Sequence, residues 1–158
     1  MTAFATTIES TVQQRTEAAL ENLVLNCIEQ QKLARKTERI YDRINSLQWV
    51  KEWCQITIGC SRRSGFTTAM LNVGTYYFKR PLFVFLNQGR VNSFKREFKD
   101  DIFLTTQDRI INDTIGHSCD AIFVDCFDLK DPLDNIYEVA ESMSQKNNPF
   151  VLALIQPF

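Results

Sequence analysis

The residues best placed to do chemistry lie in a small, basic loop between a strand-like run and a helix-like run. The stretch from Gln55 to Met70 reads QITIGCSRRSGFTTAM, so a β-branched run enters the loop and threonines follow it. Backbone N–H groups of such a loop can wrap an anion, and the N-terminus of the next helix adds partial positive charge. This is the layout of a phosphate-binding P-loop.

The loop departs from the usual P-loop pattern, G-x-x-x-x-G-K-[ST], at two points. Five residues separate Gly59 from Gly65, and Phe66 stands where the pattern has the lysine that meets the β- and γ-phosphates. Arg62 and Arg63 could supply part of the lost charge, because a guanidinium offers a planar fork of donors to phosphate oxygens. Two solvated surface arginines, in an ordinary strand–helix turn with a polar N-cap, are the alternative.

A second pattern with chemical meaning is the run CDAIFVDC, from Cys119 to Cys126. An apolar strand that ends in Asp125 is the Walker B pattern, in which the carboxylate holds Mg²⁺, usually through water. Hydrolytic versions usually carry a glutamate next, and here that position is Cys126, whose thiol is a poor general base. A buried strand that simply ends in a turn is the alternative.

Length and composition limit the class of protein. With 158 residues, 44% of them hydrophobic and 23% charged, the chain matches one globular domain, with or without a helical extension. The net charge of −1 gives no global basic excess, so contact with nucleic acid would need a local patch.

The sequence also limits compartment and partners. No run approaches the ~18 apolar residues of a membrane span, and the N-terminus lacks the pattern of a secretory leader, so no membrane partner is expected. The five cysteines include no C-x-x-C pair, which argues against a zinc site and a disulfide framework. Reduced thiols in the cytoplasm are the simplest account.

Residue periodicity divides the chain into a helical arm, residues 1–53, and an α/β domain, residues 54–158. Residues 6–53 lack Gly and Pro and have apolar residues at helical spacing, which predicts two helices or one bent helix with a polar weak point near residues 30–36. This arm either docks a partner or another copy, or packs on the domain itself.

From Gln55 onward, short and nearly continuous apolar runs alternate with helical segments. Such runs are typical of strands covered on both faces, so we expect an α/β fold with a parallel sheet and right-handed crossovers. Gly59 and Asp125 should then lie at the carboxyl ends of neighbouring strands. The predicted strands are 56–58, 82–86, 102–105, 121–124 and 150–155, and the predicted helices are 67–79, 90–99, 109–114 and 133–145.

A basic cluster with interleaved aromatic residues follows the loop region. Its members are Lys79, Arg80, Arg90, Lys95, Arg96 and Lys99, with Phe78, Phe94 and Phe98 among them. Such a cluster can bind phosphates and stack bases. The alternative is an amphipathic helix that turns Phe94 and Phe98 to the core and its basic face to solvent. Asp128, Asp131 and Asp134 form either a metal loop or a solvated turn.

The loop, the Asp strand and the order of the elements resemble the N-terminal ATPase core of phage large terminases, which is related to superfamily 1 and 2 helicases. Terminase loops often read S-R-R-x-G-K-T-T, and residues 61–68 read SRRSGFTT, which matches every fixed position except the lysine. The resemblance covers roughly residues 48–158 by element order. It implies a P-loop NTPase-like core of the RecA/ASCE type with an N-terminal helical extension.

The resemblance also implies roles for individual residues. Thr67 and Asp125 would hold Mg²⁺, with Asp125 as the catalytic carboxylate, and Arg62 or Arg63 would contact the γ-phosphate. The remaining loop residues would cradle the phosphates of ATP; they are Gly59, Ser64, Gly65 and Thr68. Gln48 or Gln55 would touch adenine, and Thr105 and Thr106 would lie where related helicases contact the nucleic-acid backbone.

We expect a degenerate terminase- or helicase-like domain that acts as a non-hydrolysing binding or regulatory module in the cytoplasm, that of the host if a phage encodes it. A protein partner or a second copy is expected, and the cofactors are either ATP with Mg²⁺ or none. One alternative is an active ATPase of a DNA-packaging or helicase-like assembly, with Arg62 and Arg63 replacing the lysine. Another is a nucleic-acid-binding accessory protein that uses Lys95, Arg96 and Lys99.

Phe66 is central to the first of these functions. Its ring either fills the phosphate cavity or packs sideways into the core, and we expect a filled or collapsed loop.

Overall fold

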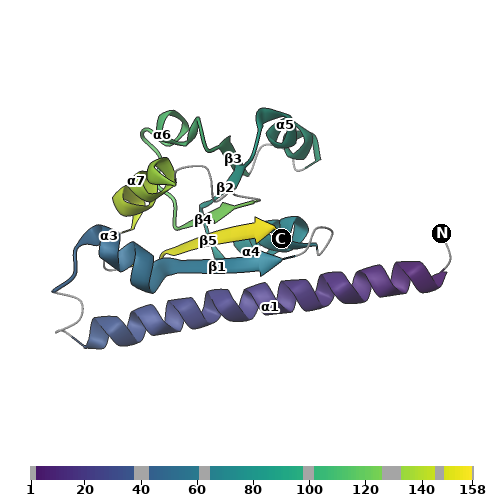
Figure 1. Cartoon of the computed structure of the whole chain (residues 1–158), viewed down its shortest axis with the longest axis horizontal. Coiled ribbons are helices and arrows are strands. Elements are labelled where there is room, and N and C mark those ends of the chain that lie inside the picture. The colour runs from purple at the N-terminus through teal and green to yellow at the C-terminus, as the bar shows by residue number, and fades with distance from the viewer. Residues whose placement is uncertain are drawn as a thin grey trace.

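The chain folds as a five-stranded, all-parallel sheet between layers of helices, with one long helix along one face (Figure 1). The structure is a computed structural model and describes residues 3–37, 43–60, 65–97, 102–125, 133–144 and 148–157. Within these ranges the side chains of residues 3–10, 60 and 157 are not described. The α/β class with a parallel sheet is confirmed.

The strands lie close to where the apolar runs predicted them, with ends shifted by one or two residues. They are β1 Gln55–Cys60, β2 Pro81–Phe85, β3 Phe103–Thr106, β4 Ala121–Val124 and β5 Val151–Pro157. Their order in the sheet is β1-β5-β4-β2-β3. The strand that follows the Asp strand in sequence therefore lies between the Asp strand and the loop strand.

This order corrects one expectation about the sheet. Gly59 on β1 and Asp125 after β4 lie at the same carboxyl edge, but their strands are not neighbours, because β5 pairs with both. Right-handed crossovers restrict the connection between parallel strands and leave their order open. Periodicity alone could not have distinguished the two orders.

The helices of the described residues also match the predicted segments. They are α1 Ala3–Lys36, α3 Ser46–Trp49, the π-helical turn η1 Val50–Cys54, α4 Phe66–Tyr77, α5 Gln88–Glu97, α6 Ile110–Asp113 and α7 Asp134–Met143. The long first helix stops at Lys36, within the predicted polar weak point.

Alternating residues of the strands face two separate cores. On β2, Phe83 and Phe85 join the core under α1 and α4, whereas Leu82 and Val84 join the core under α6 and α7. The same alternation holds along β4 and β5. Because side chains alternate between the faces of a strand, nearly continuous apolar runs fill both cores at once.

The C-terminal half of α1 is part of the first core. Leu20, Val24 and Cys27 recur at helical spacing, and all three are buried against the sheet and α4. Gln31 is buried one turn further on, where its amide donates to Phe150 O (2.6 Å) and accepts from Phe150 N (3.1 Å). Residues 20–34 are thus packed on the α/β domain.

Candidate functional site

The two sequence motifs meet at the carboxyl edge of the sheet. The first comes from the turn between β1 and α4, and the second is Asp125, directly after β4. Thr67 Oγ1 donates a hydrogen bond to Asp125 Oδ2 at 3.0 Å, across a sequence separation of 58 residues. Open α/β sheets bind their ligands at this edge.

Asp125 is held tightly and is almost removed from solvent. Its backbone N–H donates to Val84 O at 2.8 Å, which continues the β4–β2 ladder past the last strand residue. Its side chain is 2% exposed, and Arg90 Nη2 lies 3.2 Å from the same Oδ2 that accepts from Thr67. A buried carboxylate requires such partners, because removing a charge from water without a partner is costly.

Arg90 is the site residue that the sequence did not reveal. It was assigned to the basic cluster, but it lies in the first turn of α5 and reaches across the end of β2 to Asp125. Asn87 Oδ1 accepts from Arg90 N at 3.0 Å and so fixes the start of the helix. Its place just after a strand was the one available signal, because residues that follow parallel strands gather at one edge.

Gly65 shows that the long helix reaches the loop. It lies at the N-cap of α4 with φ of 81°, a left-handed backbone conformation that residues with a Cβ rarely adopt. A Cβ at this position would overlap the side-chain oxygen of Gln13 on α1. Gln13 in turn donates to Glu17 at 3.0 Å, and Glu17 accepts from Asn72 of α4 at 2.5 Å.

Phe66 is half-buried, and its ring packs against the core that contains α1 and α4. Thr68, in the same first turn of α4, is exposed, and so is Gly59, the next-to-last residue of β1. Arg62, Arg63 and Ser64 lie outside the described residues, as does Cys126. A filled or collapsed loop therefore stays a prediction.

Two pairs of residues suggested by the resemblance lie in unsuitable places. Gln55 begins β1, about 17 Å from its carboxyl end at ~3.3 Å per residue, and its amide accepts from Tyr137 Oη at 2.7 Å. Gln48 lies further upstream, on α3. Thr105 and Thr106 are buried, and Thr105 Oγ1 donates to Asp113 at 2.7 Å. Their hydroxyls are not open to a nucleic-acid backbone.

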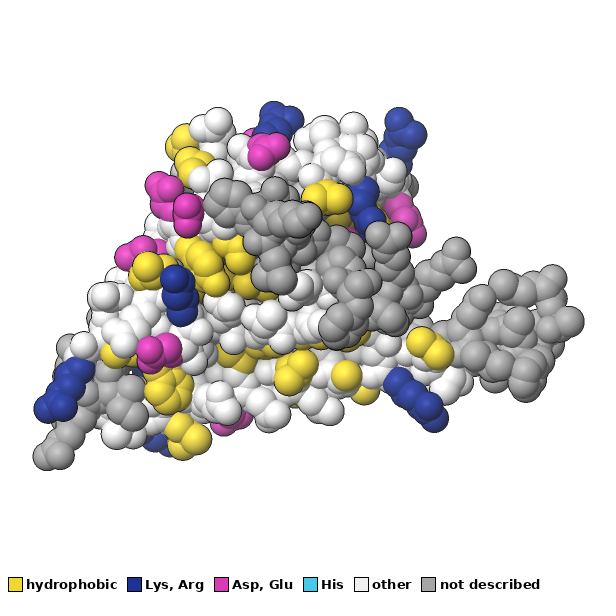
Figure 2. All heavy atoms as spheres, viewed as in Figure 1, with side chains coloured by type: hydrophobic (Ala, Val, Ile, Leu, Met, Phe, Trp, Pro, Cys, Tyr) yellow, Lys and Arg dark blue, Asp and Glu magenta, His cyan; other side chains and the backbone are white. Residues whose placement is uncertain are grey.

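The part of the basic cluster that lies on α5 belongs to an amphipathic helix. Phe94 stacks on Phe85 of the core with ring centroids 4.9 Å apart, while Lys95 and Arg96 are exposed. Phe98 and Lys99 lie outside the described residues. On the face shown in Figure 2, described basic side chains are scattered among acidic and uncharged ones. Asp134 is exposed, and Asp128 and Asp131 lie outside the described residues.

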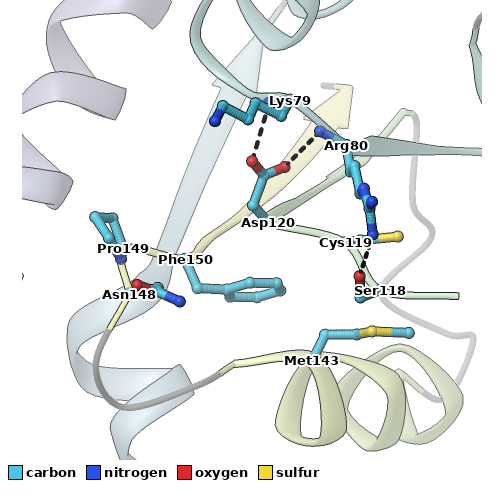
Figure 3. Close-up of a pocket in the computed structure, with 9 residues that line it drawn as sticks. All are labelled: Lys79, Arg80, Ser118, Cys119, Asp120, Met143, Asn148, Pro149 and Phe150. Atoms are coloured by element: carbon cyan, nitrogen blue, oxygen red, sulfur yellow. Dashed lines mark hydrogen bonds between the residues drawn. The ribbon is translucent and has the colours of Figure 1, made fainter.

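Two hollows lie at the opposite edge of the sheet. One of about 280 Å³ and another of about 520 Å³ flank the loops that precede β2 and β4. Asp120 accepts from the backbone N–H groups of Lys79 and Arg80 at 3.0 Å each, and Arg80 Nη1 donates to Ser118 Oγ at 2.8 Å (Figure 3). Thr67, Arg90 and Asp125 line neither hollow. The site therefore rests on polar contacts at the carboxyl edge.

Comparison with protein families, curated proteins and solved structures found no match for this chain. The described residues contain no group of three or more His, Cys, Asp and Glu that could hold a metal ion. No helix in the described part of the chain is long and apolar enough to cross a membrane.

Proposed function

We propose that this chain is a degenerate P-loop domain, similar to the ATPase core of terminases and helicases, that binds a phosphate-bearing ligand without hydrolysing it. The observation that carries the proposal is the hydrogen bond from Thr67 Oγ1 to Asp125 Oδ2. It joins the hydroxyl at the start of the post-loop helix to the carboxylate at the end of the Asp strand. A phosphate-binding loop and a Walker B strand place the same two groups side by side.

The parallel sheet supports the proposal at the level of a P-loop-like α/β fold. One strand, β5, separates the loop strand β1 from the Asp strand β4, and all five strands are parallel. Such a sheet is compatible with a P-loop-like α/β fold. The left-handed Gly65 at the N-cap of α4 lets the chain turn from the loop into the helix, whose N-terminus favours an anion.

Three features argue against hydrolysis. Phe66 replaces the lysine that stabilises charge on the transferring phosphoryl group, and one such contact is worth ~3 kcal/mol or about a hundredfold in rate. Cys126 replaces the glutamate that would position water. In addition, Asp125 Oδ2 already accepts from Thr67 and pairs with Arg90, so this oxygen is engaged within the protein.

The test combines a binding titration with a turnover assay on the full chain. ATP and GTP are titrated by calorimetry, with and without Mg²⁺, against wild type and Thr67→Val. The matched control is Thr75→Val, since Thr75 is an exposed threonine about two turns further along the same helix. We expect nucleotide binding to weaken about tenfold or more in Thr67→Val and to be unchanged in the control. Thr67→Val removes the hydrogen bond that holds the start of α4 against Asp125, and a hydrogen bond to a charged group contributes about 1.5–3 kcal/mol.

Turnover separates this function from its main rival. We expect phosphate release at the background rate, in wild type and in Asp125→Ala alike. Steady multiple turnover that disappears in Asp125→Ala but persists in Asp108→Ala, an exposed turn residue, would establish an active ATPase instead. Absence of any nucleotide or inorganic phosphate binding would refute the phosphate-binding role.

A further inference from the structure

We propose that Arg90 takes the place of a divalent metal at Asp125, so that the site works without Mg²⁺. The inference concerns the cation dependence of the site and rests on the proposed function for its phosphate ligand. The competition between Arg90 and a metal for Asp125 can be tested without any nucleotide.

The first argument is the use of a single oxygen by two donors. Asp125 Oδ2 accepts from Thr67 Oγ1 at 3.0 Å and lies 3.2 Å from Arg90 Nη2. Magnesium requires oxygen ligands at about 2.0–2.1 Å in near-octahedral geometry and keeps several waters around it. A divalent ion on this oxygen would have to displace the guanidinium or sit against its positive charge. The residues as arranged do not fit Mg²⁺.

The second argument is charge balance in a buried place. The Asp125 side chain is 2% exposed, and a carboxylate so far from water needs a cation or several hydrogen bonds. The guanidinium of arginine is always charged in proteins, so this cation is permanent and does not depend on metal supply. Arg90 therefore provides the compensation that a bound metal provides in hydrolytic relatives of the fold.

The third argument is that Arg90 is held in position. It lies in the first turn of α5, whose start is fixed by the hydrogen bond from Arg90 N to Asn87 Oδ1 at 3.0 Å. The helix is anchored to the sheet by the buried Val91 and by the stacking of Phe94 on Phe85. The guanidinium thus reaches Asp125 from a fixed helix rather than from a free surface chain.

The fourth argument concerns the rest of the guanidinium. The Arg90 side chain is 42% exposed although it contacts a buried carboxylate, so part of it faces solvent at the edge where Thr67 lies. A guanidinium has five N–H donors, and the ion pair with Asp125 uses one of them. The remaining donors can meet a phosphate oxygen, which makes Arg90 a bridge between Asp125 and an anion.

The test measures Mn²⁺ binding and thermal unfolding of the full chain without nucleotide. Arg90→Met keeps the apolar stem but removes the guanidinium that lies against Asp125 Oδ2. We expect wild type to show no Mn²⁺ site by paramagnetic titration. Arg90→Met should gain one, and its Tm should rise by about 5 °C or more at saturating metal. Arg90→Lys should behave as wild type, and Arg90→Met with Asp125→Asn should lose the site.

Matched controls and a second measurement keep the test decisive. Arg96→Met removes an exposed charge from the same helix and should show no Mn²⁺ response. If Arg90→Met does not fold without metal, refolding with and without Mn²⁺ gives the same readout, with recovery expected only when metal is present. A Mn²⁺ site in wild type that disappears in Asp125→Asn would overturn the proposal, as would absence of any metal response in Arg90→Met.

ATP titrations in EDTA and in Mg²⁺ distinguish this inference from the proposed function. Wild type should bind ATP with the same Kd in EDTA and in Mg²⁺, within about threefold, and a tighter Kd in Mg²⁺ would contradict the inference. Failure of ATP and inorganic phosphate to bind, together with the expected Mn²⁺ results, would refute the proposed function and leave the role of Arg90 at Asp125 intact.

Discussion

At the scale of single residues, Phe66 links the loop to the core. It occupies the first position of α4, directly after the left-handed Gly65, and its ring packs on the core shared with α1. Its backbone N–H can still donate to an anion at the helix start, but the ring supplies no charge. The position thus contributes to stability where a P-loop lysine would contribute to phosphate binding.

Phe66→Lys should therefore weaken the fold and strengthen nucleotide binding. Full burial of a phenylalanine contributes about 1.5–3 kcal/mol, and this ring is half-buried, so we expect a loss of about 1 kcal/mol in the free energy of unfolding, measured with urea. ATP affinity, measured by calorimetry, should rise if the lysine charge is all that the loop lacks for binding. Phe66→Leu is the control, which should cost less stability and leave affinity unchanged. Loss of stability without any gain in affinity would mark Phe66 as purely structural.

The buried thiols form a second residue-scale feature. Burial raises the pKa of Cys119 to about 11, and it also raises the pKa values of Cys27 and Cys54. All three are free cysteines in the described chain. Because the thiolate is the nucleophile, these groups are poor reagents near neutral pH.

We expect Cys119 to resist iodoacetamide near pH 8. Its pKa lies about two units above the ordinary value of 9.0, so its thiolate fraction at that pH is about a hundredfold lower. The folded pKa is the higher one, so the neutral thiol stabilises the fold fully below about pH 9 and loses that contribution as pH rises toward 11. Peptide mass spectrometry after a short pulse measures the labelling, with the urea-unfolded chain as control. Rapid labelling of the folded chain would contradict the assigned burial.

The site shows what local sequence can and cannot predict. Thr67 and Asp125 were expected together because each belongs to a short pattern with a known place relative to a strand. Arg90 was missed because its role depends on β2 lying beside β4, which no local pattern encodes. The resemblance implied that Gln48 or Gln55 touches adenine, but Gln48 lies on α3 and Gln55 begins β1, at the end away from the loop.

At the scale of elements, Gln31 fixes α1 to the start of β5. Its side-chain amide makes two hydrogen bonds to the backbone of Phe150, the residue just before that strand. Buried backbone groups without partners cost about 1–3 kcal/mol each, so one side chain satisfies two expensive groups. No local pattern predicts this contact, since a glutamine on a helix normally faces water.

Gln31→Leu should lower the free energy of unfolding by about 2–4 kcal/mol, because it leaves both Phe150 groups without partners in a buried place. Urea denaturation measures the change. Gln30→Leu is the matched control, since Gln30 is exposed on the neighbouring position of α1, and it should change stability by less than about 0.5 kcal/mol. Equal effects of the two substitutions would show that the contact with Phe150 contributes nothing measurable.

At the scale of the whole molecule, strand and helix positions followed from the sequence, but their arrangement did not. Continuous apolar runs predicted all five strands because parallel strands here fill a core on each face. The insertion of β5 between β1 and β4 has no counterpart in periodicity. The helical spacing of apolar residues predicted α1, but it did not predict what α1 packs against.

The packing of α1 indicates that the α/β domain depends on the helical arm for its stability. Leu20 and Val24 are fully buried in the core that also contains β1 and α4, and Gln31 bonds to Phe150. Each buried aliphatic side chain contributes about 1.5–3 kcal/mol, while whole domains are stable by only about 5–15 kcal/mol. Loss of the helix would therefore remove a large share of the stability.

A chain of residues 54–158 alone should fail to fold cooperatively. Without α1, one face of the sheet exposes its apolar residues to water, and we expect a broad thermal transition with strong binding of a hydrophobic dye, as in a loosely packed state. A chain of residues 11–158 is the control. It keeps Gln13, Leu20 and Val24, so it should unfold in one sharp transition. Sharp, cooperative unfolding of 54–158 would mean instead that α1 is a detachable arm, free to dock on a partner or a second copy.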